Sequence, residues 1–304
     1  MHQPVFRLPL LAILGLIAWG FSAAAPARAQ SGNPELDALL KSGVVFPGGQ
    51  MRRLRPPSMA DGLGAAGQKQ AIQTVLAMQH SVRPVNYPQF MVKNLNTPYV
   101  LLVDQDPQYD GNQPGHSINL WFVVYGDLKT VADPKFLKKQ FKPDNTGHLD
   151  TLTPDDLKRR NIVPRTIPAG NEWFVHGVFK LLQTQVLVQV QGTSRAVETT
   201  TKESTTLGCQ IDRRFDGDSK FPNDWRPAPG GVVQNSPTPY DSFGGYAKVT
   251  RLVEPAGALF VEYHLVYDEP QGWFNGANLL RAKLPQATPG DVREFRRDVR
   301  TAEQ

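Results

Sequence analysis

The stretch that decides the fold is Leu259–Tyr267, which reads LFVEYHLVY. Successive side chains of a β-strand point to opposite faces of a sheet. One set of alternating positions is apolar or aromatic and typical of a core: Leu259, Val261, Tyr263, Leu265 and Tyr267. The other set mixes apolar and polar residues, and it places the carboxylate of Glu262 beside the imidazole of His264. The stretch therefore predicts a strand with one core side and one polar side.

Other stretches rich in β-branched and aromatic residues predict further strands: Tyr99–Val103, Ile118–Tyr125, Glu172–Leu182, Thr184–Val197, Thr199–Ile211 and Tyr246–Val253. Long helical patterns do not separate these strands, which favours an antiparallel sheet. We therefore expect the α+β class, with an antiparallel sheet and with N-terminal and short helices packed on one face.

Helix signals stand at both ends of the chain. Asn33 and Pro34 are a good N-cap and first helical residue, and a stripe of apolar residues continues a second helix over 68–79. A C-terminal helix is predicted at about 289–302, with Arg293, Arg296, Arg297 and Arg300 on a solvated side. Residues 212–243 are dense in turn formers and predict a long loop.

Residues 1–29 have the order of a secretory signal peptide. A positive Arg7 precedes the apolar run 8–21, and Ala27-Arg28-Ala29 is a small-x-small cleavage site. An uncleaved membrane anchor is the alternative, but Pro26 and Arg28 end the apolar run early. We expect a mature chain that begins at Gln30, forms a single α+β domain over 30–304, is secreted or periplasmic, and does not span the membrane.

Charge and cysteine content exclude several classes of protein. The chain of 304 residues has a net charge of +5, and removal of Arg7 and Arg28 leaves +3. This mild balance gives no electrostatic case for a nucleic-acid partner. Cys209 is the single cysteine, so an intramolecular disulfide is impossible, and a buried thiol is expected.

The polar side of the predicted sheet is the candidate binding surface. Glu262 and His264 stand on it, and Phe174, His176, Val178 and Lys180 share one face of another strand. Convergence of His176, His264 and Glu262 would suit a polar ligand or a metal. A solvated face with satisfied polar groups is the alternative, in which case His264→Ala would cost little stability. Trp273 is a further candidate, either at the rim of a cleft or as part of the core.

An acidic loop follows the first predicted strand, with Asp104, Asp106 and Asp110 at alternating spacing before Gly111. Such spacing is typical of calcium loops, whose oxygen ligands converge round a sharp turn. Position 12, counted from Asp106, is Ser117 rather than the bidentate glutamate. A polar loop without metal is therefore favoured, and no cofactor is expected.

Three functions remain open, of which one is a structural surface protein that would show a large exposed apolar patch or an exposed edge strand. The chain contains no His-Glu-x-x-His, Gly-x-Ser-x-Gly or Ser-x-x-Lys motif. The favoured hypothesis is a non-enzymatic envelope protein that binds an unidentified ligand or envelope component on its polar sheet face. The alternative is a hydrolase that acts on cell-envelope material through Glu262 and His264, with or without a metal.

Three segments together resemble a family of uncharacterised secreted bacterial proteins: LLKSGV at 39–44, PPSMADGL at 56–63 and WFNGANLLRAKLP at 273–285. The resemblance implies secretion and a bacterial origin. It implies no activity and no site residue.

Overall fold

The computed structural model describes residues 32–46, 49–79, 84–105, 115–133, 136, 147–182, 186–229, 232–234, 236–240, 242–270, 273 and 279–304. The predicted signal peptide lies outside these residues. The helices are α1 (Pro34–Ser42), α2 (Ala65–Ala77), α3 (Tyr87–Phe90), α4 (Leu128–Val131), α6 (Pro154–Lys158), the 3-10 turn η2 (Arg213–Phe215) and α7 (Leu279–Ala302). No helix of the described chain is long and apolar enough to cross a membrane.

A small hairpin joins β1 (Val44–Val45) to β2 (Met51–Arg52). The other strands are β3 (Val100–Gln105), β4 (Gly115–Tyr125), β5 (Gly147–Thr151), β6 (Gly170–Leu182), β7 (Val186–Thr200), β8 (Ser204–Ile211), β9 (Asp224–Pro227), β10 (Thr238–Pro239), β11 (Phe243–Arg251) and β12 (Ala258–Asp268). They form one sheet in the order β5-β6-β7-β8-β11-β12-β4-β3, and β9 and β10 extend it from β7. Every strand pair in this sheet is antiparallel, which confirms the predicted α+β class.

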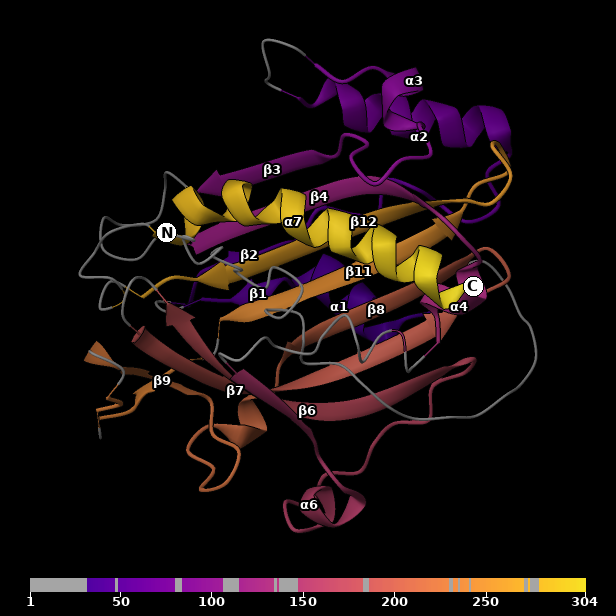
Figure 1. Ribbon diagram of the computed structural model, residues 1–304. Helices are drawn as coiled ribbons and strands as arrows, with labels where there is room; N and C mark the ends of the chain where they lie inside the picture. Colours follow the sequence, from indigo (N-terminus) through magenta and orange to yellow (C-terminus); the bar gives the residue numbers. More distant parts are fainter. Residues whose placement is uncertain are drawn as a thin grey trace.

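Helices cover both faces of the sheet, not the one face expected. We call the face that carries Leu120, Leu259 and Val261 the α7 face, because α7 packs on it through residues such as Phe295, together with α4. In Figure 1 the yellow α7 crosses the front of the sheet, and α1 lies behind it. The opposite face packs against α1 and α2. All of β12 is buried, because each of its two alternating sets has its own cover.

The α1 helix can approach the sheet closely because two strand positions lack a side chain. A Cβ at Gly244 would lie 3.0 Å from a Leu39 methyl carbon, and a Cβ at Gly208 would lie 3.0 Å from the Leu36 nitrogen. The predicted Asn33 cap also anchors α1 to the sheet. Its amide oxygen accepts bonds from the first turn, and its amide nitrogen donates to the Val197 carbonyl at 2.8 Å.

Two segments differ from the expectation. The predicted long loop 212–243 contains η2, β9 and β10, and its aromatic residues fill two core clusters: Phe215 and Phe221 in one, Trp225 and Tyr240 in the other. Helix α7 begins at Leu279, ten residues before the predicted start, and contains Pro285 and Pro289. A few well-placed aromatic anchors therefore order a segment whose composition predicts a loop.

The basic side of α7 is not solvated throughout. Arg296 is buried, and its guanidinium donates to the backbone carbonyls of Val123, Thr97, Leu95 and Pro98. Burial lowers the pKa of Arg296 to about 10. Arg296 therefore ties α7 to β4 and to the segment before β3, while Arg293, Arg297 and Arg300 are exposed as expected.

Candidate functional site

Glu262 and His264 lie on the same face of β12, as the alternation predicts, but both are completely buried. His264 stacks on Tyr246, with ring centroids 4.7 Å apart, and meets the edge of Trp121 at 5.1 Å. Its Nδ1 bonds the amide oxygen of Asn119 at 2.8 Å. Burial lowers the pKa of His264, and the neighbouring Glu262 opposes this shift. The expectation of an open polar face at these two residues is therefore wrong.

The cover over Glu262 is the segment Arg55–Asp61, which we call the strap. The Glu262 carboxylate accepts the backbone N–H groups of Ser58 at 2.6 Å and Met59 at 3.0 Å. Trp121 Nε1 donates to the Ser58 hydroxyl at 3.0 Å. These bonds fix the strap from below, so the Glu262 carboxylate holds backbone in place and is not presented to solvent.

A second polar connection holds the far end of the strap. Lys248 Nζ donates to the Met59 carbonyl at 2.7 Å and lies 2.9 Å from an Asp61 carboxylate oxygen. Burial alone would raise the pKa of Asp61, but bonds from Lys248, Thr201 and Ser204 lower it. The PPSMADGL segment of the sequence is thus a structural cover for this face of the sheet.

The remaining binding candidates do not join Glu262 and His264. His176 lies on β6, and β7, β8 and β11 separate it from β12, a distance of about 19 Å at normal strand spacing. Its Nδ1 bonds the Thr193 hydroxyl at 3.0 Å, and burial lowers its pKa to about 4. Lys180 is exposed near the end of β6. Trp273 is a core residue, packed 5.4 Å from Tyr240 and 6.2 Å from Trp225.

The acidic loop gives no metal centre in the part of the chain that is described. Asp104 is exposed on β3, whereas Asp106 and Asp110 lie outside the described residues. Nowhere among the described residues do three His, Cys, Asp or Glu side chains gather as a metal would require. Gly62–Gly67 matches the Gly-x-Gly-x-x-Gly spacing, but it opens α2 after the strap, without the preceding strand of a dinucleotide-binding unit.

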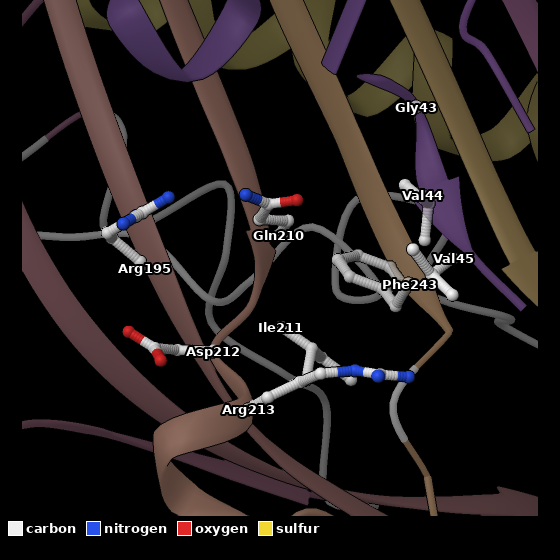
Figure 2. A pocket seen from close by; sticks show the side chains of 9 residues that line it. All are labelled: Gly43, Val44, Val45, Arg195, Gln210, Ile211, Asp212, Arg213 and Phe243. Atoms are coloured by element: carbon white, nitrogen blue, oxygen red, sulfur yellow. The ribbon is translucent and has the colours of Figure 1, made fainter. Parts of the chain in front are cut away.

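A pocket of about 230 Å³, which we call the arginine pocket, lies where β8 ends and β11 begins (Figure 2). Its lining residues are Gly43, Val44, Val45, Arg195, Gln210, Ile211, Asp212, Arg213 and Phe243. Arg195 and Gln210 are register partners on β7 and β8, and Figure 2 shows their side chains next to each other. The Arg213 side chain extends past Ile211 toward the strand that carries Phe243. The pocket therefore combines polar donors with an apolar wall.

The charges around the arginine pocket are partly compensated. The buried Glu35 carboxylate lies 2.9 Å from Arg195 and 3.2 Å from Arg165. Asp212 accepts bonds from Arg214 at 2.5 to 3.1 Å, and this bonding raises the pKa of Arg214. Asp212, which also lines the pocket, is thus bonded to Arg214, and Arg195 is bonded to Glu35.

Two donor groups line the pocket, the Arg195 guanidinium and the Gln210 amide. The buried Arg195 Nε makes no hydrogen bond in the described structure. The half-buried Gln210 lines the pocket beside Arg195, its register partner. Buried polar groups nearly always have a partner, so the Arg195 Nε donor is suited to a ligand acceptor. Sequence reasoning missed both residues, because their pairing across β7 and β8 depends on strand register.

Comparisons with known proteins find structural likeness alone. No protein-family model matches the chain, and no curated protein matches it. Among solved structures, a STAR-related lipid transfer protein from Xanthomonas axonopodis shares 12% identity, with a TM-score of 0.37, covering 66% of this chain and 98% of its own. Human StAR-related lipid transfer protein 5 shares 8% identity, with a TM-score of 0.41, covering 79% of this chain and 98% of its own. At these values the likeness carries no information on ligand or activity.

Proposed function

We propose that this protein is a non-enzymatic ligand-binding protein of the bacterial cell envelope, and that it holds a small organic acid in the arginine pocket. The observation that carries the proposal is that Arg195, whose buried Nε makes no hydrogen bond, lies with Gln210 in a pocket that has an apolar wall. Val44, Val45 and Phe243 form that wall. A carboxylate fits the donors, and a short hydrocarbon chain fits the wall.

The volume of the pocket limits the size of the ligand. Pockets for drug-sized molecules measure roughly 300–1,000 Å³, and the arginine pocket is smaller, at about 230 Å³. A short-chain carboxylic acid is within this limit, whereas a whole phospholipid is far beyond it. The pocket therefore favours a small acid as its occupant.

The hydrolase hypothesis loses its proposed machinery. It needs Glu262 or His264 at an accessible surface, and both are buried beneath the strap. The two bonds from Ser58 and Met59 further occupy the Glu262 carboxylate. No observation on the described residues favours this alternative.

Binding is tested by titrating the mature protein with hexanoate in a calorimeter. We expect saturable binding that falls at least tenfold in Gln210→Leu and in Arg213→Gln. Arg293→Gln, an exposed change on α7, is the matched control and should bind as the unchanged protein does. Absence of hexanoate binding, or equal binding by all variants, would contradict the assignment.

Phospholipid vesicles provide a second probe, which tests a lipid as the occupant in place of a small acid. If the protein extracted phospholipid from vesicles and did not bind hexanoate, the assigned ligand would be a lipid and not a small acid. Export is tested separately by the intact mass of protein recovered from the envelope, which should begin at Gln30. A chain that retains Met1 in the membrane fraction would contradict export by cleavage.

A further inference from the structure

A second hollow, about 270 Å³ in volume, lies on the face of the sheet that the strap covers, beside β4. Its polar lining consists of Arg53, Arg55, Asp104, Ser117 and Asn119, and Leu265 and Val266 form part of its wall. It shares no lining residue with the arginine pocket. The strands that build it are β3, β4 and β12, which lie next to one another in the sheet (Figure 1).

Asn119 is the buried polar group of this hollow. Its side chain is only 4% exposed, and its amide oxygen is taken by His264 Nδ1 at 2.8 Å. This bond orients the amide, whose nitrogen carries two N–H donors. The Ser117 hydroxyl lines the same hollow. The hollow thus contains donors that a ligand oxygen can satisfy.

Charges of both signs line the hollow without pairing. Arg53 and Asp104 are exposed, and Arg55 touches the Met78 sulfur at 3.3 Å. Neither arginine lies within 4.0 Å of the Asp104 carboxylate in the described structure. Opposite charges that share a hollow without bonding each other are complementary to a ligand that carries both charges.

We propose that this hollow is a binding site for a small zwitterion with the chemistry of an α-amino acid. The ligand carboxylate meets the guanidinium groups of Arg53 and Arg55 and the Asn119 amide, since charge-assisted bonds of this kind are the strong ones. The ligand ammonium meets the Asp104 carboxylate. The volume accommodates a molecule of this size and excludes a folded peptide segment.

The test compares three probes on the mature protein by NMR titration: L-alanine, propionate and ethylamine. Propionate lacks the ammonium of alanine, and ethylamine lacks its carboxylate. We expect alanine to bind at least tenfold more tightly than either fragment. Asp104→Asn should remove the preference for alanine over propionate, and Arg53→Gln should remove the preference over ethylamine.

Asp155→Asn, an exposed carboxylate on α6, is the matched control and should leave all three affinities unchanged. Equal binding of propionate and alanine would reduce the hollow to an anion site and overturn the proposal, as would the absence of alanine binding. The Arg213→Gln variant separates this site from the arginine pocket. It should lose hexanoate binding and keep alanine binding, so that either proposal can fail alone.

Discussion

Glu262 and Ser58 are 204 residues apart in the chain, and the carboxylate of one accepts the backbone N–H of the other at 2.6 Å. The same carboxylate accepts the N–H of Met59. Loop backbone that crosses a sheet face carries donors that must be paired. A buried acid on β12 supplies the acceptor, and this explains why a charged residue stands in the centre of the sheet.

Removal of this acceptor should destabilise the protein. Glu262→Ala leaves two N–H groups of the strap without a partner, and we expect a loss of about 3 kcal/mol in the free energy of unfolding. Urea unfolding measures the loss. Glu254→Ala, an exposed change in the turn before β12, should stay within about 0.5 kcal/mol. Equal stability of the two variants would show that the strap does not depend on Glu262.

Arg296 should be as important to the attachment of α7 as Glu262 is to the attachment of the strap. Arg296→Met leaves the carbonyls of Val123 and Thr97 without their donor, and the expected loss is about 3 kcal/mol. The neighbouring Arg297→Met removes an exposed side chain and should change stability by no more than about 0.5 kcal/mol. Thermal and urea unfolding of the two variants measure this difference. A larger loss of stability in the Arg297 variant would contradict the role of Arg296 in holding α7.

Stability should fall as the pH rises from about 4.5 to about 7, because of Glu198. Burial raises the pKa of Glu198 from 4.5 to about 7, while bonds from Thr205 and Asn171 oppose the shift. The folded protein thus holds a proton that the unfolded chain releases near pH 4.5. The stabilising contribution is complete below that pH and is lost as the pH rises through about 7, up to about 3 kcal/mol. Glu198→Gln should make the urea midpoint of unfolding nearly independent of pH between pH 5 and pH 8. If the midpoint of this variant still fell with pH as in the unchanged protein, Glu198 would not be the cause of the pH dependence.

Cys209 should be unreactive in the folded protein. The thiol is fully buried, and burial raises its pKa well above the ordinary value. Because the thiolate is the reactive form, we expect no labelling by a thiol reagent until urea unfolds the chain. Reductant should leave the melting temperature unchanged, since no disulfide exists within the chain. Rapid labelling of the native protein would show that this part of β8 opens.

Much of the local structure follows from the sequence alone. The alternation in Leu259–Tyr267 predicts β12 and the correct division of its side chains between two faces. Asn33 caps α1, as its helix-start pattern predicts. These features depend on a few neighbouring residues and on the fixed periods of the backbone, so they can be predicted without knowledge of the tertiary structure.

The tertiary structure decided what covers each face, and with it the candidate sites. The alternation of side chains along β12 shows that Glu262 and His264 share a face. It carries no information on the strap, which comes from the other end of the chain. The same holds for the arginine pocket, where Arg195 and Gln210 meet only through the register of β7 and β8. Burial and register depend on contacts between distant segments, and so the accessible chemistry of this protein lies at positions that the local pattern did not single out.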